Sequence, residues 1–114
     1  MASLYSGLRR AETCFPNSTA TVFLDRRMSW KAFGAEVREL AHALRGVGVR
    51  RGHRMAVVAR NSDCMLQYMY AAACLGVVFV PLNVRYKDRI HITHSHTHTS
   101  TLGHTLFVSL SLAL

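Results

Sequence analysis

The apolar positions between Trp30 and Leu44 recur at intervals of three and four residues, which places them on one side of a helix. Ser29 stands where an N-cap belongs, and Gly46 and Gly48 follow the last apolar residue, so we predict a helix from Trp30 to these glycines. The stripe comprises Trp30, Phe33, Val37, Leu40, Ala41 and Leu44. The residues predicted to face water are Lys31, Glu36, Arg38 and Glu39.

Two short apolar runs follow, Met55–Ala59 and Val77–Val80. Continuous apolar runs of this length are typical of parallel strands that are buried on both faces. Between them, polar residues 61–63 offer an N-cap to a helix that is apolar nearly all round and ends at Gly76. The order strand, helix, strand predicts a βαβ unit of an α/β fold, with Pro81 closing the second strand.

The residues before this unit predict two smaller elements. Ala20–Leu24, a polar turn at 25–27 and the return at Met28 predict a hairpin. The first residues predict a short surface helix, because Arg9 and Arg10 interrupt the apolar run that a secretory signal needs. A transit peptide remains an alternative, since this stretch is basic and contains serines.

The chain changes character after Arg89. Every Lys, Arg, Asp and Glu lies at or before this residue, and residues 90–114 alternate His with Thr and then Ser with Leu, as translated dinucleotide repeats do. We therefore predict an extension at 1–10, one domain at 11–89, and a low-complexity tail of low order at 90–114. The apolar end Leu106–Leu114 is prone to β-pairing and is too short to cross a bilayer.

Several residue types invite a functional interpretation. His94, His96 and His98 would share one face of a strand and could chelate a metal, but no carboxylate is near to orient the rings. Cys64 and Cys74 have no neighbouring acid or histidine to activate a thiolate, so we assign them structural roles.

The glycines after the first long helix do not form a phosphate loop. Gly46, Gly48 and Gly52 lead from a helix into a strand, and no Lys followed by Ser or Thr comes after them. His42 falls on the solvated side of its helix, while Tyr68 and Tyr70 are predicted to pack against neighbours.

The formal charge of +8, from 14 Lys and Arg against 6 Asp and Glu, raises the question of an acidic partner. The basic residues are scattered in pairs without interleaved aromatic residues, so we predict no nucleic-acid binding. Three cysteines without paired spacing indicate a reducing, intracellular location. We expect the cytoplasm, with mitochondria and peroxisomes left open.

Three segments together resemble the adenylate-forming superfamily of AMP-dependent synthetases and ligases. They are MSWKAF at 28–33, LAHALRGVGVRRGHRMAVVARNS at 40–62 and AAACLGVVFVPLNVRY at 71–86. The PLN sequence at 81–83 is more similar to the acyl-CoA synthetase branch. Ala32, His53 and Cys74 depart from the usual pattern, and residues from 90 onward leave it altogether.

This resemblance implies the partial N-terminal subdomain of an enzyme that joins a carboxylate to CoA with ATP and magnesium, releasing AMP and pyrophosphate. The family's phosphate-binding loop, magnesium ligands and C-terminal lysine would lie beyond the resembling residues. We therefore assign no catalytic, cofactor-binding or metal-binding residue to this chain, expect it to bind none of these cofactors, and predict that it is inactive alone. The alternative is a non-catalytic truncated isoform that associates through exposed apolar surface, and a small nucleic-acid binder is the least favoured hypothesis.

Overall fold

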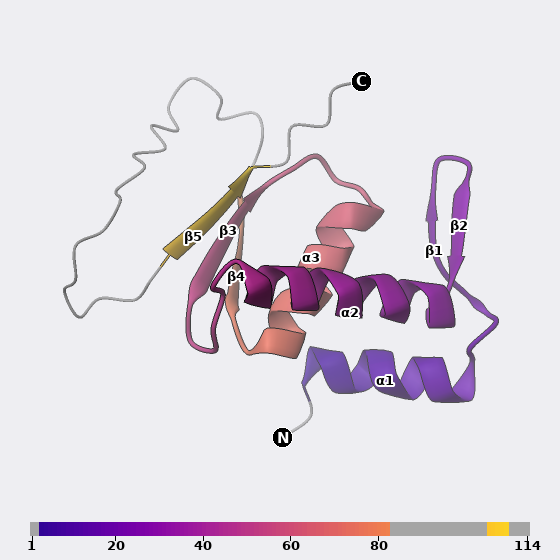
Figure 1. Ribbon diagram of the computed structural model, residues 1–114. Helices are drawn as coiled ribbons and strands as arrows, with labels where there is room; N and C mark the ends of the chain where they lie inside the picture. The colour runs from indigo at the N-terminus through magenta and orange to yellow at the C-terminus, as the bar shows by residue number, and fades with distance from the viewer. Residues whose placement is uncertain (1–2, 83–104, 110–114) are drawn as a thin grey trace.

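The computed structural model describes residues 3–82 and 105–109, which form three helices and five strands (Figure 1). The helices are α1 (Leu4–Cys14), α2 (Trp30–Gly46) and α3 (Asp63–Leu75). The strands are β1 (Thr19–Phe23), β2 (Arg26–Ser29), β3 (Arg54–Val58), β4 (Val78–Leu82) and β5 (Thr105–Ser109).

Strand β3 is the centre of a parallel sheet with the order β4-β3-β5. Its pairing with β4 runs from Arg54 opposite Val78 to Val58 opposite Leu82, and α3 forms the crossover between these strands. The predicted α/β class and βαβ unit are therefore confirmed. The second strand runs through Pro81 to Leu82, two residues further than predicted, because a strand with one neighbour can include a residue that lacks an N–H donor.

Strand β5 lies within the tail and pairs with the other edge of β3, from Arg54 opposite Thr105 to Val58 opposite Ser109. Figure 1 shows it alongside β3, on the side away from β4. It begins one residue before the stretch Leu106–Leu114 that the sequence marks as prone to β-pairing. The low order predicted for residues 90–104 and 110–114, and the three alternating histidines, fall outside the described residues.

The predicted stripe of α2 forms the main contact with the rest of the core. Phe33 and Val37 are fully buried, and Trp30 and Leu40 pack against the same cluster. The Ser29 hydroxyl accepts a hydrogen bond from the Ala32 N–H at 3.2 Å, as expected of an N-cap. The buried residues of this stripe are Phe33, Val37, Ala41 and Leu44.

The polar side of α2 is less exposed than predicted. Lys31 and Glu39 face solvent, but Glu36 and Arg38 are only half-exposed. Glu36 forms an ion pair with Arg26 of β2, and Arg38 forms one with Glu12 of α1. Both side chains therefore keep contact with water, as predicted, but they also pair with opposite charges that neighbouring elements bring, which the sequence did not predict.

Helix α3 begins at Ser62, whose hydroxyl accepts from the Met65 N–H at 3.4 Å, and ends at Gly76 in the left-handed conformation, φ 69°. It buries Ala71, Ala72 and Leu75 as expected of an apolar helix. It also buries Asp63 and Gln67, while its methionines at 65 and 69 stay half-exposed. The uneven burial leaves an apolar part of α3 uncovered.

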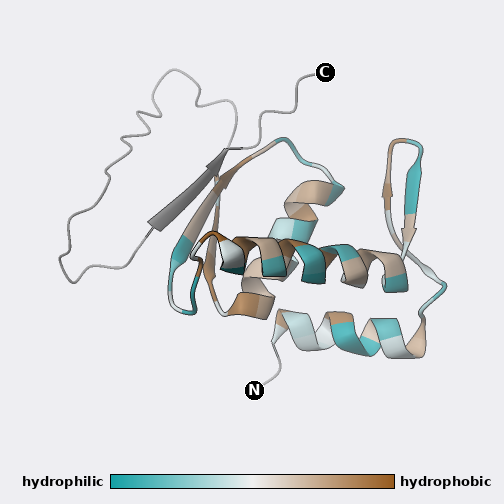
Figure 2. Cartoon of the chain, viewed as in Figure 1, coloured by the Kyte–Doolittle hydropathy of each residue, from teal (hydrophilic) through white to brown (hydrophobic). Residues whose placement is uncertain are grey.

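The hairpin is confirmed, with a tighter turn than the sequence predicts. Arg26 and Arg27, assigned to the turn, belong to β2, and the turn is made by Leu24 and Asp25. Leu24 has a φ of 52°, an unfavourable conformation for a side chain with a Cβ, and is 81% exposed. Figure 2 shows β2 as mostly hydrophilic and β1 as more hydrophobic.

The predicted surface helix near the N-terminus is confirmed as α1, which packs on α2. Leu8 is 1% exposed within the common core. The Arg38 guanidinium donates from Nη1 to both carboxylate oxygens of Glu12, at 2.7 and 2.9 Å. A Cβ on Gly34 would fall on this Glu12 carboxylate. Glycine at this position of α2 therefore leaves room for the ion pair that joins the two helices.

We predict that Gly34→Ala has little effect in the native background and stabilises a Glu12→Ala variant. Alanine in a helix interior normally gains about 1 kcal/mol over glycine. In the native chain the new methyl group displaces the Glu12 carboxylate from Arg38, which offsets this gain by about 0.5–1 kcal/mol. Urea denaturation of the four combinations measures the coupling, and equal effects of Gly34→Ala in both backgrounds would contradict it.

Candidate functional site

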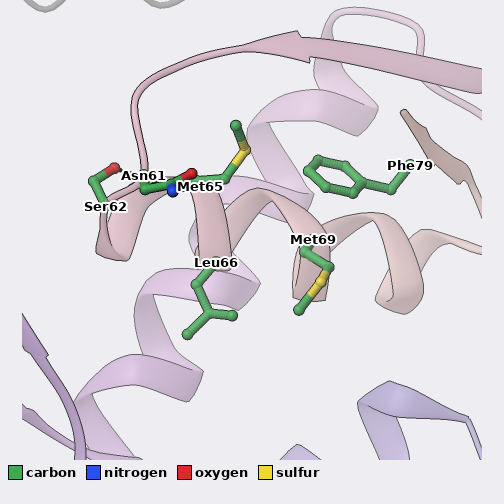
Figure 3. Close-up of a pocket in the computed structure, with 6 residues that line it drawn as sticks. All are labelled: Asn61, Ser62, Met65, Leu66, Met69 and Phe79. Carbon is green, nitrogen blue, oxygen red and sulfur yellow. Dashed lines mark hydrogen bonds between the residues drawn. The ribbon is translucent and has the colours of Figure 1, made fainter. Parts of the chain in front are cut away.

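A hollow of about 300 Å³ opens beside the N-terminal half of α3 (Figure 3). Most of its lining comes from one side of this helix and the turn before it, and Phe79 of β4 closes the far side. The lining residues are Asn61, Ser62, Met65, Leu66, Met69 and Phe79. It is the same half-exposed side of α3 that the core leaves uncovered.

The lining of this hollow is suited to an apolar group. Four of its six residues are apolar, and the other two are an amide and a hydroxyl. The Ser62 hydroxyl already accepts the Met65 N–H as the helix cap. None of the six side chains titrates in the range of general acid–base catalysis, so the hollow can bind apolar surface but offers no proton-transfer group.

A cluster of paired polar side chains joins the hairpin to α2 and α3. Arg26 donates from Nη1 to Asp63 Oδ2 at 2.8 Å and from Nη2 to Glu36 Oε1 at 2.6 Å. Gln67 Nε2 donates to the other Glu36 oxygen at 2.6 Å. The hydrogen bond with Glu36 is the main reason that the pKa of Arg26 is raised. These contacts tie three elements together and leave little capacity to bind a substrate.

Asp63 is the buried charge of this cluster, with a side chain 6% exposed. Its Oδ1 accepts the N–H of Cys64 at 2.9 Å while Oδ2 accepts Arg26. The sequence pattern indicates Asp63 only as part of a helix start and Arg26 as part of a turn. Asp63 and Gln67 could have indicated this cluster, because they are an acid and an amide four residues apart on a helix that is otherwise apolar.

The cysteines are free thiols. The expectation that no acid neighbours Cys64 was wrong, because the Asp63 carboxylate accepts its N–H. Burial raises the pKa of the Cys64 thiol, and the Asp63 carboxylate raises that pKa further, so this acid does not activate the thiol. A raised pKa favours the protonated form, which is the weaker nucleophile. Cys74 is half-buried against the core, and Cys14 is exposed.

The remaining candidates lie apart from the hollow. His42 is exposed, as predicted, and His53 accepts the Arg50 N–H at Nδ1, 3.3 Å away. Tyr70 meets Phe33 edge to face at 5.5 Å, and Tyr68 packs on the core with its pKa raised by burial, so both tyrosines pack as predicted. Gly48 and Gly52 have positive φ in the bend that leads into β3.

Residues 3–82 and 105–109 contain neither a cluster of metal-binding side chains nor a membrane-spanning helix. No group of three or more His, Cys, Asp and Glu side chains in this part of the chain could hold a metal ion. No helix within the same residues is long and apolar enough to span a membrane.

We predict that Arg26→Ala lowers the free energy of unfolding by about 1–3 kcal/mol, because it leaves the buried Asp63 carboxylate without its cation. The half-exposed position of Arg26 keeps the loss at the lower part of the range for buried pairs. Chemical denaturation measures this loss. Arg27→Ala, one residue along β2 and exposed, is the matched control and should change stability by less than about 0.5 kcal/mol. Equal losses in the two variants would exclude a stabilising role for the cluster.

Comparison with known proteins gives a consistent result. The family model described as AMP-binding enzyme matches residues 8–99. The 2-succinylbenzoate–CoA ligase of Arabidopsis thaliana is 34% identical over 79 residues, covering 69% of this chain and 14% of that protein. The indoleacetate–CoA ligase of Aromatoleum aromaticum is 39% identical over 76 residues, covering 67% of this chain and 15% of that protein.

The fold has a similar counterpart among solved structures. The N-terminal subdomain of NpsA from Klebsiella oxytoca superposes with a TM-score of 0.74 at 19% identity, over 96% of this chain and 32% of that one. At this identity the similarity concerns the fold alone. The chain thus spans about one seventh of the length of these two curated ligases.

Proposed function

Because the chain belongs to the AMP-binding enzyme family, we propose that its domain is the first part of an ATP-dependent acyl-CoA synthetase and that it does not catalyse the reaction alone. The curated relatives are CoA ligases, which supports a parent reaction between a carboxylate, ATP and CoA. The observation that carries this proposal is the match of the family over residues 8–99 together with the parallel βαβ unit that those residues form.

The role proposed for residues 3–82 is to supply a packed unit on which the rest of such an enzyme assembles. Its core is complete on the side where α2 and α3 meet β3, with Met55 and Val57 fully buried. Val78 on β4 is 53% exposed, and the hollow beside α3 is open. In a longer enzyme these apolar areas would be covered by further chain. ATP, magnesium and CoA would be bound by that further chain.

We expect no ATP–pyrophosphate exchange above a no-protein control when the chain is given a panel of fatty and aromatic carboxylic acids, because the groups that would stabilise phosphate charge lie beyond the resembling residues. Exchange that depends on one of these acids would contradict the proposed inactivity.

A chimera tests whether these residues can replace the same part of an active enzyme. The matching segment of the Aromatoleum aromaticum indoleacetate–CoA ligase is replaced by the aligned residues of this chain, and the chimera should keep indoleacetate-dependent exchange. The same chimera with Val37→Asp, which places a charge in the core, is the control that should lose it. A soluble, folded chimera without activity would count against the proposed structural role.

We propose as a second candidate that the chain acts as a non-catalytic association module through the hollow beside α3. The observation that favours it is the lining itself, where Met65, Leu66 and Met69 stay half-exposed around an opening closed by Phe79. Flexible methionine side chains adapt to varied apolar partners, and an uncovered apolar area favours association with another copy.

For this second candidate, light scattering should give a mass that rises with protein concentration, and Leu66→Glu should abolish the rise by placing a charge in the hollow. Leu24→Glu is the matched control, because Leu24 is an exposed leucine on the hairpin tip away from α3. A concentration-independent monomer mass for the native chain would exclude the association module.

We also propose an intracellular, reducing location, which is supported by three free cysteines in the described residues. The name of the Arabidopsis relative places that protein in chloroplasts and peroxisomes. This chain is proposed for the cytoplasm, with mitochondria and peroxisomes as the alternatives, and without nucleic acid as a partner.

A further inference from the structure

The segment from the end of α2 to the first residue of β3, residues 45–54, carries the densest positive charge of the described chain. Arg45, Arg50, Arg51 and Arg54 are all exposed, and no acid occurs between residues 45 and 54. The ion pairs found within the described residues use Arg26 and Arg38, so no carboxylate in this part of the chain neutralises these four guanidinium groups. We call this segment the arginine bend.

Hydrogen bonds hold the arginine bend in one conformation. Arg50 donates from Nη1 to the Arg45 carbonyl at 2.7 Å and to the Val49 carbonyl at 3.0 Å. The Gly52 N–H donates to the Gly76 carbonyl at 2.9 Å, which joins the bend to the end of α3. The stem of Arg51 lies over Gly76, where an added Cβ would be 2.9 Å from Arg51 Cγ. The backbone that carries these charges is therefore joined to the ends of both α2 and α3.

An apolar side chain projects from the same bend. Val47 is 71% exposed, between the charges of Arg45 and Arg50 along the chain. Its neighbours Gly46 and Gly48 have open space around them, since an added Cβ on either would meet no atom within 4 Å. Val47 and its two neighbours are therefore accessible to another surface.

We propose that the arginine bend docks on an anionic lipid bilayer, with the guanidinium groups at the headgroups and Val47 in the interfacial layer. Exposed cations contribute about a fivefold increase in binding each at an anionic membrane surface, and an apolar tip supplies a second contact with the lipid. The bend contains no Phe, Tyr or Trp on which bases could stack, which favours a lipid surface over single-stranded nucleic acid.

The location of the bend is compatible with ligand binding elsewhere on the fold. Strands β3 and β4 both begin at this end of the sheet, where Figure 2 shows hydrophilic colour at the start of β3. Ligands of parallel α/β sheets bind at the opposite end of the sheet, outside the carboxyl ends of the strands. Those ends, at Val58 and Leu82, lie at the end of the sheet away from the bend.

The test is flotation of the full chain with vesicles of phosphatidylcholine alone and of phosphatidylcholine with about one third phosphatidylserine, at about 0.1 M salt. The native chain should bind the anionic vesicles, and the binding should weaken as salt increases. Equal binding to the two vesicle types, or to neither, would overturn the proposal.

The patch variant is Arg45→Gln with Arg51→Gln and Arg54→Gln, which retains the Arg50 contacts with the end of α2. It should lose about a hundredfold in binding to anionic vesicles, which is fivefold for each of three charges. The matched control is Arg9→Gln with Arg10→Gln and Arg27→Gln, which removes the same charge from exposed positions on α1 and β2. An equal loss in the control would show that net charge alone is responsible, and would overturn the proposal.

Two further measurements complete the test. Val47→Asp should reduce binding to anionic vesicles without changing the thermal unfolding midpoint, and unchanged binding would exclude the apolar contact.

Short duplex DNA is added as a competitor at equal charge concentration. Displacement of the chain from vesicles by DNA at this ratio would indicate a nucleic-acid surface and contradict the proposed lipid surface.

Discussion

The structure depends on β3, because the apolar run at residues 55–58 within this strand needs hydrogen-bond partners on both edges and cover on both faces. Strands β4 and β5 supply the hydrogen-bond partners, because each pairs with β3 in parallel over all five residues. Helices α2 and α3 cover one face of the strand, where Met55 and Val57 join the core. The remaining elements pack on these two helices. Helix α1 contacts both α2 and α3, and Arg26 joins the hairpin to the same two helices.

Elements governed by local patterns were predictable from the sequence. The three- and four-residue spacing from Trp30 to Leu44 gave α2 and its buried stripe, and serines at 29 and 62 marked the two caps. Apolar runs flanking a helix gave the parallel pair of strands around α3. In these elements the local structure is determined by each residue and by its neighbours three or four positions away along the chain.

Features that depend on distant residues were not predictable. Glu36 and Arg38 have the polar pattern of a solvated helix face, and only the approach of β2 and α1 gives them partners. The Arg26–Asp63 contact spans 37 positions, and no local pattern encodes such a pair. The sequence indicates exposed apolar surface but not the position of the hollow beside α3, because the side of an apolar helix that stays open depends on how the surrounding chain covers it. No catalytic constellation was predicted, and that prediction stays untested.

The parallel pairing of β5 with β3 has a consequence for the order in which the sheet can assemble. Strand β4 follows β3 after a single helix, whereas β5 joins it only after a connection about twice as long, and closing the longer loop costs about 0.6 kcal/mol more. During synthesis, α2, β3, α3 and β4 are complete before β5 leaves the ribosome. One edge of β3 is therefore open in the nascent chain for as long as the tail is being made, and that edge is the point at which the growing protein is most exposed to mispairing.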